Sequence, residues 1–276
     1  MFDLIKTDFY RIFKSKTFYV ILAICIGLPL FTVLMTFGVN KGLNALIGIE
    51  GEDFNAINGK LLISGIYGLS SNVGLILPIF LVIFVNTDVS NGLLRNKLLV
   101  GKSRLSIYFS HLIVITILSV AFITLSSLII SPLTFWLVPY SSELNGDEIR
   151  SIIFYYILGT LSFVFIASLV VMLTLNFNHV VFPIIIIVLF GIGIMLLTQI
   201  IALIPFEMLD QNKNIPSFLI PVIKELPYFI PIYTGNSFAF GQIKVLDFIF
   251  GIISLVIFTA LADIGGAISF KNKEIK

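Results

Sequence analysis

The chain has 276 residues, of which 58% are hydrophobic and only 12% are charged, and its mean hydropathy is +1.09. Soluble domains carry roughly 25% charged residues and expose much of their surface to water, so this composition excludes a water-soluble globular protein. The formal net charge of +2 is too small to indicate binding to nucleic acid. The single cysteine, Cys25, excludes an intrachain disulfide and a cysteine-pair metal site.

The first seventeen residues combine charge with a helical repeat of apolar side chains. At about 100° per residue the apolar members cover one face of a helix, and they are Phe2, Ile5, Phe9, Ile12 and Phe13. Charged and polar side chains such as Lys6 and Lys14 cover the opposite face. The pattern predicts an interfacial helix within residues 1–17 that lies along the inner leaflet. It serves either as a simple anchor or as a lever that also contacts a cytoplasmic partner.

Six apolar segments then reach the length of about 20 residues that a membrane-spanning helix requires. They are approximately Phe18–Gly38, Ile66–Val85, Ile107–Phe135, Ile152–Leu175, Val180–Ile204 and Phe248–Ser269. The first segment begins after a charged stretch and lacks a cleavage site of small residues, so we expect a mature helix and not a signal peptide. The predicted fold is an all-α integral membrane protein, with residues 1–276 forming a single transmembrane domain.

The distribution of Lys and Arg predicts the orientation of these spans. One set of termini and loops contains the larger number of cations: Lys6, Arg11, Lys14, Lys16, Arg95, Lys97, Lys102, Arg104, Lys271, Lys273 and Lys276. The opposite set contains fewer, although its segments are longer: Lys41, Lys60, Arg150, Lys213, Lys224 and Lys244. The cation-rich side is expected to be cytoplasmic, which places both termini inside the cell.

Residues 86–106, between the second and third spans, carry the most specific pattern. Ser90 or Asn91 is a suitable cap for a short helix, whose apolar side would include Leu94 and Leu98. Gly101 is expected to end this helix. Ser103 or Ser106 then starts the third span. The short helix and the start of this span contain two sequence runs, Asn91-Gly-Leu-Leu-Arg-Asn-Lys97 and Gly101-Lys-Ser-Arg-Leu-Ser-Ile-Tyr108.

These runs resemble the coupling region of the ABC-2 type exporter permeases, and in particular the peptide and lantibiotic exporters of Gram-positive bacteria. An acidic residue, a glycine, a short helix and a hydroxyl-Arg step recur in that family. The matching positions here are Asp88, Gly92, Arg95, Gly101, Ser103 and Arg104. Many relatives carry Lys a turn or two after the Arg, where this chain has Ser110 and His111.

The resemblance extends to the last external loop, residues 205–247, which holds five of the ten prolines. Two apolar pieces in this loop, Ser217–Ile223 and Tyr228–Ile232, are too short to span a membrane. In the family this region forms short re-entrant helices before the last span. The alternative is an ordinary folded external loop.

The resemblance implies a permease in the bacterial cell membrane that moves an amphipathic peptide. Two permease chains, identical or sisters, would form the pathway. Two separate P-loop ATPase subunits would carry ATP and Mg, with no cofactor on this chain. Leu94 and Leu98 would fill a groove on the ATPase, so that Leu94→Asp uncouples transport without unfolding the chain. Arg95 and Arg104 would contact the ATPase or hold the segment against Asp88.

Other functions find less support in the sequence. No phosphate-binding loop occurs, so we expect no nucleotide hydrolysis, and no converging acids or histidines indicate an enzyme or a metal site. His111 and His179 are isolated. Asp263 in the last span is a candidate functional charge within the membrane; the alternative is a pairing or capping role near the inner face, for example with a cation of the N-terminal helix. A secondary transporter would need paired intramembrane charges or inverted repeats. A non-transporting sensor or immunity protein that binds an antimicrobial peptide remains the alternative.

Overall fold

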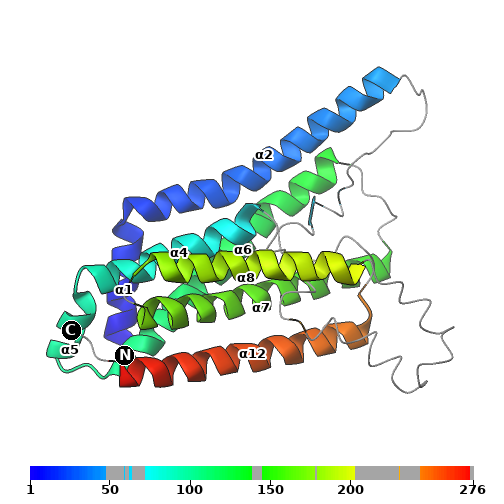
Figure 1. The fold of residues 1–276 in the computed structure, drawn as a ribbon. Coiled ribbons are helices and arrows are strands. Elements are labelled where there is room, and N and C mark those ends of the chain that lie inside the picture. Colours follow the sequence, from blue (N-terminus) through cyan, green and yellow to red (C-terminus); the bar gives the residue numbers. More distant parts are fainter. Residues whose placement is uncertain are drawn as a thin grey trace, which may run out of the picture.

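A computed structural model of the chain describes residues 1–47, 59, 62–63, 72–138, 145–177, 179–202, 230 and 243–273. Within these residues every regular element is an α-helix, and the long helices run alongside one another as a bundle (Figure 1). The helices are α1 (Phe2–Lys14), α2 (Lys16–Ile47), α4 (Asn72–Ser90), α5 (Leu93–Leu99), α6 (Arg104–Leu137), α7 (Gly146–Asn176), α8 (Val181–Ala202) and α12 (Val245–Asn272). The all-α prediction is confirmed.

Five of the described helices are long and apolar enough to cross a membrane, and a sixth is obtained if α4 and α5 count as one span bent by 54°. They lie at the six predicted positions, although residues 66–71 of the second prediction fall outside the described residues. Most helices extend beyond the predicted spans because backbone hydrogen bonding continues into the polar ends. The protein is therefore a multi-pass membrane protein.

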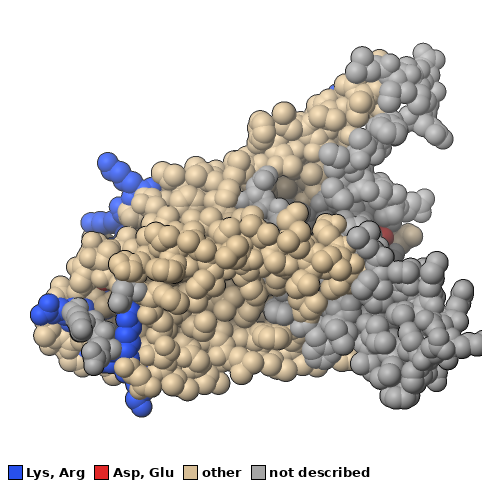
Figure 2. Space-filling view, viewed as in Figure 1, with Lys and Arg blue, Asp and Glu red and all other residues tan. Residues whose placement is uncertain are grey.

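The surface has the distribution of charge expected for such a protein. On the face shown, Lys and Arg gather at one end of the molecule and are absent from the long middle section (Figure 2). We call this end the basic end; it contains α1, α5, the start of α6 and the end of α12. Large apolar side chains are exposed along the middle section, including Leu189 and Leu196 of α8 and Leu261 of α12. Lipid is the solvent that such side chains require.

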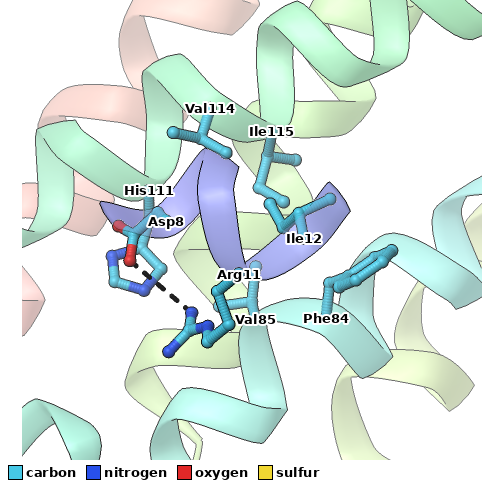
Figure 3. A pocket seen from close by; sticks show the side chains of 8 residues that line it. All are labelled: Asp8, Arg11, Ile12, Phe84, Val85, His111, Val114 and Ile115. Atoms are coloured by element: carbon cyan, nitrogen blue, oxygen red, sulfur yellow. Dashed lines mark ion pairs between the residues drawn. The ribbon is translucent and has the colours of Figure 1, made fainter. Parts of the chain in front are cut away.

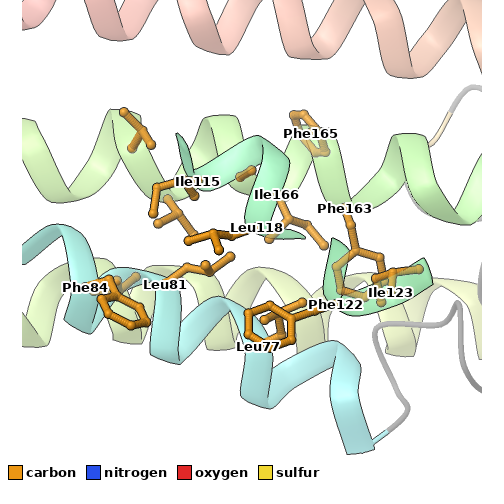
Figure 4. Packing of buried hydrophobic residues seen from close by; sticks show 14 of the residues in the cluster. Leu77, Leu81, Phe84, Ile115, Leu118, Phe122, Ile123, Phe163, Phe165 and Ile166 are labelled. Carbon is orange, nitrogen blue, oxygen red and sulfur yellow. The ribbon is translucent and has the colours of Figure 1, made fainter. Parts of the chain in front are cut away.

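The core of the bundle lies between α4, α6 and α7. Leu77 and Leu81 of α4 meet Leu118 of α6 and Ile166 of α7 (Figure 4). α7 contacts α12, α6, α4 and α8, and it is the most buried of the spans. Small residues on its buried positions, such as Gly159, allow the neighbouring helices to approach.

α1 is helical as predicted and lies across the ends of the other helices (Figure 1). It ends at Ser15, whose hydroxyl donates to the carbonyl of Ile12 and accepts from the amide of Phe18. The predicted apolar face is divided: Phe2 and Phe13 are exposed, whereas Ile12 is buried and Ile5 and Phe9 pack against the core. The buried residues of α1 recur at four-residue spacing: Leu4, Asp8 and Ile12.

The segment 86–106 is more helical than predicted, because α4 continues to Ser90. The expected cap at Ser90 or Asn91 is wrong: the N-cap of α5 is Gly92, and no side chain caps it. Gly92 has φ 67°, a left-handed conformation that glycine adopts without the strain of a Cβ. Gly101, at φ 82°, follows α5 as predicted, and Ser103 caps α6 by accepting from the amide of Ser106.

The remaining predicted element, the re-entrant segment at residues 205–247, lies outside the described residues apart from 230 and 243–247. α12 begins at Val245.

Candidate functional site

A buried cluster of charged side chains lies at the basic end, where α1, α4, α5 and α6 meet. Its two acids come from different helices, Asp8 from α1 and Asp88 from α4, and they are only 2% and 0% exposed. Burying a charge is costly unless it is paired and hydrogen-bonded. The partners that satisfy them are Arg11 of α1, Lys97 of α5, and Ser110 and His111 of α6.

Asp88 is the centre of this cluster. Its Oδ2 accepts from Lys97 Nζ at 3.0 Å and lies 3.0 Å from His111 Nε2. Its Oδ1 pairs with the guanidinium of Arg11. A single carboxylate on α4 therefore holds side chains from α1, α5 and α6.

Asp8 supplies the second acid. Its Oδ1 lies 2.9 Å from Lys97 Nζ and 3.5 Å from the guanidinium of Arg11, and its Oδ2 accepts from Ser110 Oγ at 3.0 Å. Asp8 and Arg11 lie on consecutive turns of α1 and form an ion pair with each other (Figure 3). Lys97 thus bridges the carboxylates of Asp8 and Asp88, which are far apart in the sequence.

The two ring nitrogens of His111 both face oxygen acceptors. Nδ1 lies 2.9 Å from the carbonyl of Ile107, and Nε2 faces the Asp88 carboxylate. A neutral imidazole carries only one N–H. Through these two contacts the imidazole ring links the backbone of α6 to the carboxylate on α4.

A cleft of about 210 Å³ lies beside the cluster, between the α1–α2 junction and the end of α4. Its lining includes Arg11, Ser15, Thr87 and Asn91. α1 therefore packs against α6 on one side and borders this cleft on the other.

The arginines predicted to act here have other positions. Arg95 is exposed on α5 and takes no part in the cluster; Lys97, two residues later, pairs with Asp88 instead. Arg104 donates to the carbonyls of Lys271 and Lys273, at 2.8 and 2.5 Å. It therefore fastens the start of α6 to the end of α12 and does not hold the segment against Asp88.

The leucines of α5 also differ from expectation. Leu94 is 5% exposed and belongs to the core of its own chain, and Leu98 packs against that core. The apolar side chains that α5 and its C-cap present outward are Leu99 and Val100, which are 76% and 77% exposed. Residues four apart on a short helix share one face, and in this chain the face with Leu94 and Leu98 packs inward; their contact with a partner stays a prediction.

Several cluster residues were missed in the sequence: Asp8, Arg11, Lys97 and Ser110 had no assigned role at this site. A signal existed in α1, because Leu4, Asp8 and Ile12 recur at four-residue spacing. No local pattern indicated that Lys97 would reach Asp8.

The other singled-out polar residues lie apart from the cluster. His179 is exposed next to the turn between α7 and α8. Asp263 faces Tyr108 of α6 and Ser168 of α7, and among the described residues no cation of α1 pairs with it.

No known protein family matches the chain, and no curated protein matches its sequence.

Proposed function

We propose that this chain is the membrane-spanning permease subunit of an ATP-driven (ABC) exporter that moves an amphipathic peptide out of a bacterial cell or its membrane. The observation that carries the proposal is the attachment of α5. Its outward side exposes Leu99 together with polar side chains, and its inward side is tied through Lys97 to α1 and α4, and through Asp88 to α6. The basic end then faces the cytoplasm, as the distribution of Lys and Arg indicates.

The ion cluster gives α5 the connections that a coupling element needs. Lys97 bonds at once to Asp8 of α1 and Asp88 of α4, and Asp88 bonds to His111 of α6. Separating a buried ion pair leaves an uncompensated charge, which costs about 3–5 kcal/mol. When α5 is displaced, moving α1, α4 and α6 with it therefore costs less free energy than breaking these contacts.

The outward side of α5 suits a protein partner. Leu99 and Val100 lie exposed together, and the chain carries Arg95 and Lys102 on either side of them. An apolar pair flanked by cations fits an apolar groove with an acidic rim. The sequence contains no phosphate-binding loop, so the ATP and Mg would be held by separate P-loop ATPase subunits, two for each pair of permease chains.

The remaining features fit a peptide exporter in the plasma membrane. The spans carry few charges, and an apolar pathway formed with a second copy or a sister permease suits amphipathic cargo better than ions. The choice of peptide cargo rests on the resemblance of residues 86–108 to the peptide and lantibiotic exporters.

The test is co-purification of the chain from its native membranes in mild detergent, with the accompanying proteins identified and their ATPase activity measured. Recovery of a P-loop ATPase with the wild-type chain supports the proposal, and we expect Leu99→Asp to lose it at least tenfold. Leu99→Met retains the apolar contact, and Asn96→Asp adds the same charge to the exposed side of α5; both should retain the ATPase.

A wild-type chain that purifies alone, from membranes in which it is active, contradicts the proposal and favours the stand-alone sensor or immunity protein. Loss of the ATPase in Asn96→Asp as well would show that added charge alone is responsible, which removes Leu99 from the docking surface.

A further inference from the structure

A second buried polar group lies within the membrane-spanning part of the bundle, between α6, α7 and α12. Asp263 of α12 faces Ser168 of α7 and Tyr108 of α6. Asp263 lies nine positions before the end of α12 at Asn272, or about 14 Å along a helix that rises 1.5 Å per residue. Asp263 is partly exposed as a residue, but its Oδ1 is buried.

Three of the four side-chain oxygens in this group make no hydrogen bond of good geometry. Tyr108 and Ser168 are 0% and 1% exposed, and no well-formed hydrogen bond reaches the hydroxyl oxygen of either one or Oδ1 of Asp263. More than 90% of buried polar groups in proteins are hydrogen-bonded. Three unsatisfied oxygens on facing helices therefore indicate that something small completes the site.

The charge of Asp263 also lacks compensation among the described residues. Its neighbours on α6 and α7, Tyr108 and Ser168, are neutral hydroxyls. The cations of the nearby helix ends are already engaged: Lys273 donates to the carbonyl of Leu175, and Arg104 donates to carbonyls at the end of α12. An ionised carboxylate with no cation is costly at this depth.

The packing leaves little room for a metal ion. A Cβ added to Gly266, one turn along α12 from Asp263, would lie 2.2 Å from the Tyr108 hydroxyl and 2.8 Å from Cγ of Met172. Hard cations such as Mg²⁺ and Ca²⁺ take about six or more oxygen ligands, and Asp263, Ser168 and Tyr108 together supply four side-chain oxygens. A proton needs only one acceptor oxygen and adds no volume.

We propose that Asp263 is a proton-binding site within the membrane, with the hydroxyls of Ser168 and Tyr108 as its hydrogen-bonding partners. The bound proton forms the O–H bond of a neutral carboxylic acid, which donates to one hydroxyl while the carbonyl oxygen accepts from the other. On release the proton passes to water, so release requires α12 to open its contact with α6 and α7. The proposal does not depend on transport or on an ATPase partner.

The first experiment is infrared difference spectroscopy on the full-length protein in lipid nanodiscs. A protonated carboxyl has a carbonyl stretch that is distinct from that of a carboxylate. We expect wild-type protein at pH 7 to show this band and Asp263→Asn to lose it. The control Asp147→Asn, at an exposed ion pair with Arg150, should retain it. Equal spectra for wild type and Asp263→Asn would overturn the proposal.

A second measurement needs no variant and covers the case in which Asp263→Asn does not fold. A hydrophobic carbodiimide reacts with protonated carboxyl groups: the acid's proton moves to a carbodiimide nitrogen, and the carboxylate oxygen attacks the central carbon. Peptide mapping of wild-type protein at pH 7 should then find the adduct on Asp263 and not on the ion-paired Asp88. An adduct on Asp88 with Asp263 unmodified would reverse the assignment and overturn the proposal.

Discussion

Asp88 and Asp263 are both acids in apolar helices, but the chain accommodates them in opposite ways. Asp88 is surrounded by Arg11, Lys97 and His111 from three other helices. Asp263 faces two neutral hydroxyls. The difference follows the side chains that surround each acid: around Asp88, lysine and arginine reach a buried acid while their chains stay close to water. Among the described residues no cation reaches Asp263, and its neutralisation requires a proton.

The comparison therefore separates a charged, structural junction from a neutral polar site. The junction joins helices that approach from different directions, and it is satisfied by the chain itself. The polar site is not satisfied by the chain itself, and so it is the better place for an exchangeable ligand.

The largest expected effect is at the centre of the junction. Asp88→Ala leaves Arg11, Lys97 and His111 without their shared partner, and we expect the free energy of unfolding to fall by about 3–5 kcal/mol. Asp263→Asn keeps the size of a neutral acid and should change the free energy of unfolding by less than about 1 kcal/mol. Unfolding of the purified proteins in detergent measures both. Equal losses would show that the two acids are not handled differently.

The second expectation concerns α5, the helix that the junction holds. Leu94→Asp places an unpaired charge in the core, and we expect a loss of about 3 kcal/mol or more in unfolding free energy. Leu99→Asp lies on the exposed side and should stay within about 0.5 kcal/mol of wild type. The same unfolding assay distinguishes them. A stable Leu94→Asp protein would return Leu94 to the outward surface and weaken the assigned orientation of α5.

The smallest effect tests the tight packing beside Asp263. Gly266→Ala forces Tyr108 and Met172 to move, and overpacking of this kind costs about 1–3 kcal/mol. The adjacent Gly265→Ala meets nothing within 4 Å, and replacing a mid-helix glycine should raise stability by about 0.5–1 kcal/mol. The two melting temperatures should therefore move in opposite directions. Shifts of the same sign would show that the space beside Tyr108 is larger than described.

Much of the fold was predictable because its signals are local. An apolar run of sufficient length specifies a spanning helix regardless of its neighbours, and the six predicted spans coincide with described helices. Gly101 was also assigned correctly, and Ser103 was one of the two starts expected for α6, since a left-handed residue and a side-chain cap depend on adjacent backbone alone. The candidate site was predicted only in part: Asp88 was identified, but its partners were not.

The sequence by itself determined the membrane-spanning helices, the helical N-terminal segment and the breaks around α5, because hydropathy, periodicity and capping act within a few residues. Only the tertiary structure decided that Lys97 joins Asp8 to Asp88, that Arg104 fastens α6 to the end of α12, and that Leu94 points inward while Leu99 points out. A charged side chain can reach any acid that packing brings within about 4 Å. Which acid that is depends on how helices distant in sequence come together.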